Sequence, residues 1–181
     1  MDANANEKTR VWGQSLALYH PSATGSGAAF RLEPRVNRRP TDRANCFFLE
    51  LAPQKTAAER QRGQRAPATF DWERKLTVKL GFSDICEMLA VLEGQSERAG
   101  APRNGLFHDT GAANTLITFE RDEQGGVLVG LSRKTREDKD PRRIRFVLSN
   151  REAIGVRCLL QTGLFFVCFH TQMLSPHGRC G

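Results

Sequence analysis

The segment 70–80 alternates apolar and charged side chains more regularly than any other part of this 181-residue chain. Successive side chains of a β-strand point to opposite faces of its sheet, so we expect a strand with one face in a core and the other in water. The expected core face holds Phe70, Trp72, Leu76, Val78 and Leu80, with Arg74 among them, and the expected polar face includes Lys75 and Lys79. Such a strand belongs to an antiparallel sheet that is covered on one side.

The rest of the chain shows patterns that predict four strands, a helix, at least three more strands and a final helix. Runs of strands followed by single helices are typical of α+β proteins with antiparallel sheets. The expected strands are 15–20, 28–33, 46–51, 70–80, 115–121, 127–133 and 143–148, and the expected helices are 82–93 and 149–170. We expect one domain over residues 14–171, with polar tails at 1–13 and 172–181.

Local signals set the expected ends of these elements. Pro34 and Pro53 are expected to end the second and third strands, because proline cannot donate to a β-ladder. The polar segment 54–69 is expected to be a flexible hairpin loop. We expect the first helix to have Asp84 as its N-cap and the second to open with a capping box at 149–152.

Positive charge points to a polyanionic partner. The chain has 27 Lys and Arg against 20 Asp and Glu, which gives a net charge of +7. A surplus of this kind most often serves nucleic-acid binding, although a soluble basic protein without such a partner stays open. Seven of the cations fall in the segment 133–145, which is either a phosphate-contacting hairpin or a solvated tip.

Candidate contacts follow from the faces of the expected strands. In the third strand Phe47 shares a face with leucines, whereas Phe48 shares a face with Glu50 and is the candidate exposed ring. Exposed rings beside cations bind single strands, because bases stack on the rings while the charges follow the backbone. The predicted nucleic-acid contacts are Arg31, Phe48, Trp72, Lys75, Lys79, Arg133, Arg143 and Arg145, with Trp72 weakened by its position on a core face.

Enzymatic signatures are scarce. There is no phosphate-binding loop, no G-x-S-x-G element and no H-x-x-H pair, so we expect a non-enzymatic protein without metal or cofactor. A metal-dependent nuclease that uses His108, Asp109 and Glu120 is kept as an alternative. The five cysteines form no C-x-x-C pair, and a cytoplasmic or nucleoid location is expected, with an organelle left open.

The last expected helix is apolar on nearly every side between residues 158 and 169. A helix of that kind must be buried all round. We expect it to pack against its copies in a homo-oligomer, with burial between the chain's own sheets as the alternative.

Three motifs in order resemble one known family. Phe70-Asp-Trp-Glu-Arg-Lys75 resembles the aromatic-Asp-Trp-x-Arg-Lys signature of the Whirly single-stranded-DNA-binding proteins. The segment 27–34 resembles the first hairpin of that family, and Phe107-His-Asp109 matches an element that follows its first helix. The resemblance covers residues 15–170. It implies two antiparallel four-stranded sheets packed across each other with two helices, and a homotetramer held together through the C-terminal helix.

The resemblance also implies binding of single-stranded DNA with little sequence preference, in genome maintenance, DNA repair or transcription. One departure is clear: the plant members carry Lys-Gly-Lys-Ala-Ala in the first hairpin, and this chain has Gly25-Ser-Gly-Ala-Ala29. The inserts at 35–45 and 54–69 are also longer than the family pattern. A single-stranded-RNA-binding or annealing protein of the same fold is the main alternative, and a purely structural oligomer is another.

Overall fold

Two large antiparallel sheets, a small two-stranded hairpin and two helices make up the computed structural model, which describes residues 15–35, 45–61 and 64–169. The N-terminal sheet has the order β1-β2-β3, and both β6 and β7 pair with the far side of β3. Its strands are β1 (Leu16–His20), β2 (Ala28–Arg35), β3 (Cys46–Thr56), β6 (Thr69–Phe70) and β7 (Leu76–Leu80). Because β6 and β7 occupy successive parts of one edge, the sheet is four strands wide.

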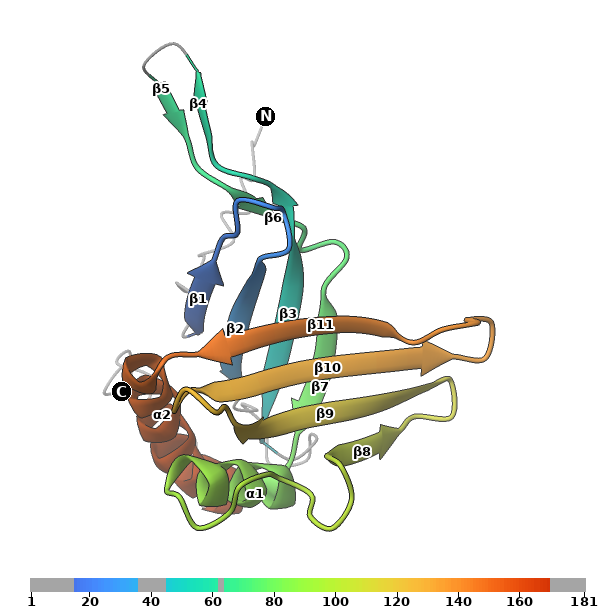
Figure 1. Ribbon diagram of the computed structural model, residues 1–181. Coiled ribbons are helices and arrows are strands. Elements are labelled where there is room, and N and C mark those ends of the chain that lie inside the picture. Colours follow the sequence, from blue (N-terminus) through green and yellow to red (C-terminus); the bar gives the residue numbers. More distant parts are fainter. Residues whose placement is uncertain (1–14, 36–44, 62–63, 170–181) are drawn as a thin grey trace, which may run out of the picture.

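The C-terminal sheet has the order β11-β10-β9-β8. Its strands are β8 (Leu106–Asp109), β9 (Ala113–Arg121), β10 (Val127–Thr135) and β11 (Arg142–Leu148). The strands of this sheet run across those of the N-terminal sheet, as Figure 1 shows. Phe30 of β2 and Phe146 of β11 meet where the sheets cross, with ring centroids 5.6 Å apart.

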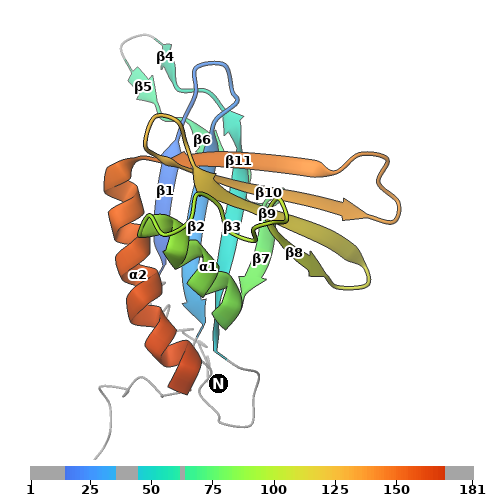
Figure 2. The same cartoon turned by 60° about the horizontal axis from the view of Figure 1, so that its bottom comes forward.

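Helices α1 (Phe82–Leu92) and α2 (Asn150–Phe169) lie together at one side of the crossed sheets (Figure 2). Ile85 and Met88 of α1 and Val156 and Leu160 of α2 join the buried core. Gly163 allows α2 to approach the N-terminal sheet, because a Cβ atom there would lie only 2.0 Å from the ring of Phe47. The helices leave the outer faces of both sheets uncovered.

The predicted fold class is confirmed, but the expected strand 70–80 is two strands with a turn between them. The side chain of Asp71 accepts the backbone N–H of Arg74 at 3.1 Å and so bends the chain. Leu76, Val78 and Leu80 enter the core as expected. Residues 71–75 lie in the turn between β6 and β7, so their side chains do not follow the alternation of a strand. Trp72 therefore does not point toward the core.

Other expected boundaries also change. Pro34 and Pro53 do not end their strands, since they pair across the ladder with Phe47 and Ala28 respectively. The hairpin expected within 54–69 is present as the strands β4 (Glu59–Gln61) and β5 (Gln64–Ala66), but the segment is not all loop, because it also contains the end of β3 and the start of β6.

The helix starts give one confirmation and one correction. Gly81, not Asp84, is the N-cap of α1, and the carboxylate of Asp84 accepts the Gly81 N–H at 2.8 Å. The capping box at the start of α2 is confirmed, because Ser149 donates its N–H to Glu152 at 2.8 Å. The expected tails 1–13 and 172–181 and most of the insert 35–45 lie outside the described residues.

Candidate nucleic-acid interface

A buried carboxylate organises the outer face of the N-terminal sheet. Glu50 of β3 is only 6 % exposed and is bound by Arg31, by Lys75 Nζ at 2.6 Å and by the hydroxyl of Thr77 at 3.1 Å. Burial alone would raise the pKa of Glu50, but the hydrogen bonds and charges of Lys75 and Arg31 outweigh it and hold the pKa below its ordinary value. Two predicted phosphate contacts, Arg31 and Lys75, are therefore each paired with an acid.

Aromatic rings gather beside this ion-pair network. The guanidinium of Arg31 lies 4.6 Å above the centre of the Trp72 ring. Tyr19, which is 52 % exposed, lies 5.4 Å from Phe70 and 6.4 Å from Trp72 between ring centroids. Trp72 thus belongs to the outer face, and the expectation that its face is core is wrong.

Phe48 also lies on this outer face, as predicted. It is half-buried, and the guanidinium of Arg35 covers its ring at 4.8 Å. Lys79 is its cross-strand neighbour on β7. Lys79 is exposed and forms no ion pair with any described residue, so it differs from the paired Lys75.

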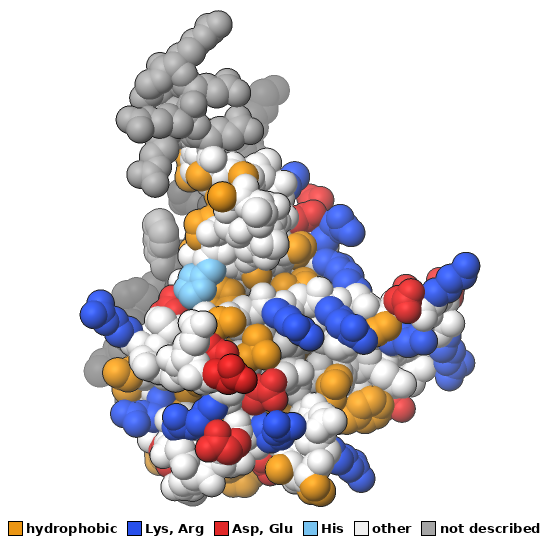
Figure 3. Space-filling model, viewed as in Figure 1, with side chains coloured by type: hydrophobic (Ala, Val, Ile, Leu, Met, Phe, Trp, Pro, Cys, Tyr) orange, Lys and Arg blue, Asp and Glu red, His pale blue; other side chains and the backbone are white. Residues whose placement is uncertain are grey.

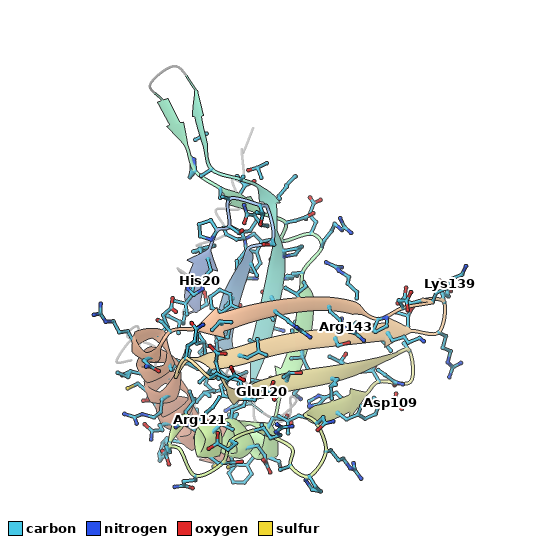
Figure 4. All side chains as sticks on the ribbon, viewed as in Figure 1. His20, Asp109, Glu120, Arg121, Lys139 and Arg143 are labelled. Atoms are coloured by element: carbon cyan, nitrogen blue, oxygen red, sulfur yellow. The ribbon has the colours of Figure 1, made fainter. Side chains whose placement is uncertain are left out.

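The outer face of the C-terminal sheet carries cations that have no acidic partner. Arg143 and Arg145 alternate with the core residues of β11 and are exposed. Within the described ranges neither of them is paired with a carboxylate. Figure 3 shows Lys and Arg side chains gathered over β10 and β11, and Figure 4 shows Arg143 on the open side of the sheet.

An exposed ring on this face was not expected from the sequence. Phe107 of β8 is 56 % exposed. The ladder aligns it with Leu116 of β9, Ser132 of β10 and Arg143 of β11. The sequence pattern predicts no strand at Phe107, and the outward direction of this side chain depends on the pairing of β8 with β9, for which the local sequence has no signal.

Arg133 points the other way, between the sheets. Its Nε donates to the hydroxyl of Thr115 at 3.0 Å, and its Nη2 donates to the backbone carbonyl of Thr77 in the other sheet. Arg142 is its partner in the β10–β11 ladder. Among the predicted contacts, Arg133 is the one for which a hydrogen bond from the guanidinium to the other sheet is seen within the described residues.

The residues of the nuclease alternative are not brought together. His108 lies on the inner side of β8 and contacts Asp84 at 3.0 Å, while the Asp109 carboxylate accepts the Gly111 N–H. Asp109 and Glu120 lie far apart along the outer face (Figure 4). Within the described residues no three potential metal ligands cluster. In the same ranges, neither helix combines the length and the hydrophobicity that a membrane-spanning segment needs.

Several solved structures are similar to this arrangement, although no family model and no curated protein sequence matches the chain. WHY1 from Arabidopsis thaliana superposes with a TM-score of 0.64 at 16 % identity, over 86 % of this chain and 85 % of that one. The plant transcriptional regulator PBF-2 gives 0.58 at 16 % identity, over 85 % and 81 %. MRP1/MRP2 from a trypanosome gives 0.59 at 15 % identity, over 90 % and 99 %.

At these identities the likeness concerns the fold. The plant structures superpose on 85–86 % of this chain, in agreement with the fold that the Phe70–Lys75 and Phe107–Asp109 motifs predict. The chain therefore has a Whirly-like fold.

Proposed function

We propose that this protein binds single-stranded nucleic acid, with DNA as the preferred form and little sequence specificity, and that it catalyses no reaction. The observation that carries the proposal is the set of exposed cations without acidic partners, Lys79, Arg143 and Arg145, on faces that also present aromatic rings. Phosphates would lie along the cations and bases would stack on rings such as Phe107 and Phe48.

Arg31 and Lys75, the cations that are paired with Glu50, are expected to contribute less to binding than the unpaired ones. Arg31 and Lys75 neutralise Glu50, so their charge is available to a phosphate only in part. Trp72 lies under Arg31 and offers an aromatic edge beside them. We assign the stronger phosphate contacts to the unpaired cations and the weaker ones to Arg31 and Lys75. Arg133 stays a predicted contact whose guanidinium already joins the two sheets.

Neighbours of this fold support nucleic acid as the ligand class without deciding between DNA and RNA. One solved structure is a guide-RNA-binding protein complex bound to its RNA, with a TM-score of 0.53 at 17 % identity. PBF-2 is described as a transcriptional regulator. A role in transcription, DNA repair or genome maintenance, in the cytoplasm, nucleoid or an organelle, is part of the proposal.

The proposed assembly is a homotetramer joined through α2. Ile154 and Phe165 of this helix are 56 % and 55 % exposed, although other residues of α2 join the core. Large apolar side chains on an exposed helix face favour a contact with another chain. Light scattering of the full chain tests this part, and a monomer would contradict it.

The binding test is fluorescence anisotropy with matched single-stranded DNA, duplex DNA and single-stranded RNA over a range of salt concentrations. We expect single-stranded DNA to bind more tightly than duplex, with a strong salt dependence. Lys79→Ala and Arg143→Ala should each reduce the slope of log K against log salt by about 0.7. Arg103→Ala removes the same charge from an exposed loop and is the matched control. Equal weak binding to all three ligands would refute the proposal.

A further inference from the structure

Three arginines meet where the two sheets join, outside the faces described above. Arg133 and Arg142 are cross-strand partners on the inner side of β10 and β11, at the end of the ladder. Arg74 lies in the turn between β6 and β7, and Arg133 reaches across to the Thr77 carbonyl of β7. We call Arg74, Arg133 and Arg142 the junction arginines.

Within the described residues, the positive charges of the junction arginines are not balanced by ion pairs with acidic side chains. The Nη2 atom of Arg142 is buried, and no described residue accepts a hydrogen bond from it. Burial and the neighbouring charges of Arg74 and Arg133 lower the pKa of Arg142, and Asp71 opposes them only in part. Asp71 forms no ion pair within the described ranges, and its side chain accepts the backbone N–H of Arg74.

A buried guanidinium N–H without an acceptor destabilises the folded state, and so does the repulsion between neighbouring positive charges. A bound anion would accept the hydrogen bond and reduce the repulsion. A phosphate oxygen pair matches the planar fork of a guanidinium, which is why arginine is the usual residue for phosphate recognition. The unsatisfied side chain and its neighbours therefore have the chemistry of an oxyanion site.

We propose that the junction arginines bind one phosphate group of a single-stranded nucleic acid as it passes from the outer face of one sheet to that of the other. The position supports this path. Trp72 and Lys75 flank Arg74 in the same turn and belong to the N-terminal sheet face, while Arg143 follows Arg142 and belongs to the C-terminal face. In this arrangement Arg142 donates to the phosphate, Arg74 adds charge from the solvent side, and Arg133 holds the sheets together.

The inference rests on the proposed function, but its chemistry can be tested separately. The first measurement is the melting temperature of the full chain in inorganic phosphate against chloride at equal ionic strength. We expect phosphate to raise it, and Arg142→Gln and Arg74→Gln to abolish the difference. Arg74 is exposed, so its replacement tests the site even if Arg142→Gln folds poorly. Arg151→Gln, an exposed arginine of α2, is the matched control and should keep the phosphate response.

The second measurement is the salt dependence of single-stranded DNA binding. Each of the two junction variants should lower the slope of log K against log salt by about 0.7, and Arg151→Gln should leave it unchanged. Normal DNA binding with unchanged slopes and no phosphate response would overturn the inference and leave the proposed function standing. A phosphate response without DNA binding would identify a site for free phosphate and refute the path along the nucleic acid.

Discussion

Replacing Glu50 with glutamine should destabilise the protein and strengthen its binding to polyanions. The substitution keeps the shape of the side chain but removes the charge that holds Arg31 and Lys75. A hydrogen bond to a charged group contributes about 1.5–3 kcal/mol. The side chains of Arg31 and Lys75 are 30 % and 32 % exposed, so water compensates part of the loss. We expect a net cost of about 2 kcal/mol, which lowers the melting temperature by about 4–8 °C in a chain of this size.

The pH dependence of this cost identifies its origin. The folded state lowers the pKa of Glu50, so its contribution is complete above the unfolded value of 4.5 and is lost as pH falls through the lower folded value. Urea unfolding of the wild type and Glu50→Gln should differ at neutral pH and converge in acid. Glu33→Gln removes the same charge from the same sheet face, where Glu33 has no ion pair with a described residue, and should change stability by less than about 0.5 kcal/mol.

Glu50→Gln should weaken the fold but strengthen the binding of single-stranded DNA. Without Glu50, Arg31 and Lys75 become free to contact phosphate, so the salt slope for single-stranded DNA should steepen by about 0.7 for each cation engaged. An equally stable variant, or a stability difference that persists in acid, would refute the argument that Glu50 is a charged anchor. A variant that is less stable but has an unchanged slope would refute the assignment of Arg31 and Lys75 to the interface.

Three further substitutions test other parts of the structure. Phe107→Ala should weaken single-stranded DNA binding by about 1–3 kcal/mol in anisotropy titrations, because one stacking surface is lost, with little change in melting temperature. Gly163→Ala should cost about 1–3 kcal/mol in urea unfolding, because its Cβ would collide with Phe47, whereas Gly155→Ala in the same helix meets open space and should stabilise by up to about 1 kcal/mol. Arg133→Gln should lower the unfolding free energy by about 1–3 kcal/mol, because its hydrogen bond to the Thr77 carbonyl of the other sheet and its bond to Thr115 of its own sheet are lost, and equal stability would count against a bridging role.

The local sequence was sufficient to predict the core face of a strand wherever apolar and polar side chains alternate along it. The alternation of Leu76, Val78 and Leu80 predicted a half-buried strand, and the even positions of β11 predicted its core face. The capping box of Ser149 and Glu152 marked the start of the last helix. These features depend on contacts between residues close in sequence, so a short segment contains all the information they need.

Tertiary structure decided which polar side chains are free to act. Lys75 and Lys79 look equivalent in the sequence, and the pairing of β3 with β7 sets Glu50 opposite Thr77, two residues from each of them. Only Lys75, which lies just before β7, forms an ion pair with Glu50 among the described residues. Arg133 and Arg143 lie in the same basic segment, yet one joins the sheets and the other faces solvent. The sequence by itself therefore determined the charge, the fold class and most of the long strands, but not the division of 70–80 into β6 and β7 or the strand β8. Ion pairing, the exposure of Phe107 and the meeting of the junction arginines depend on residues distant in the chain, and only the packing of the two sheets brings those residues together.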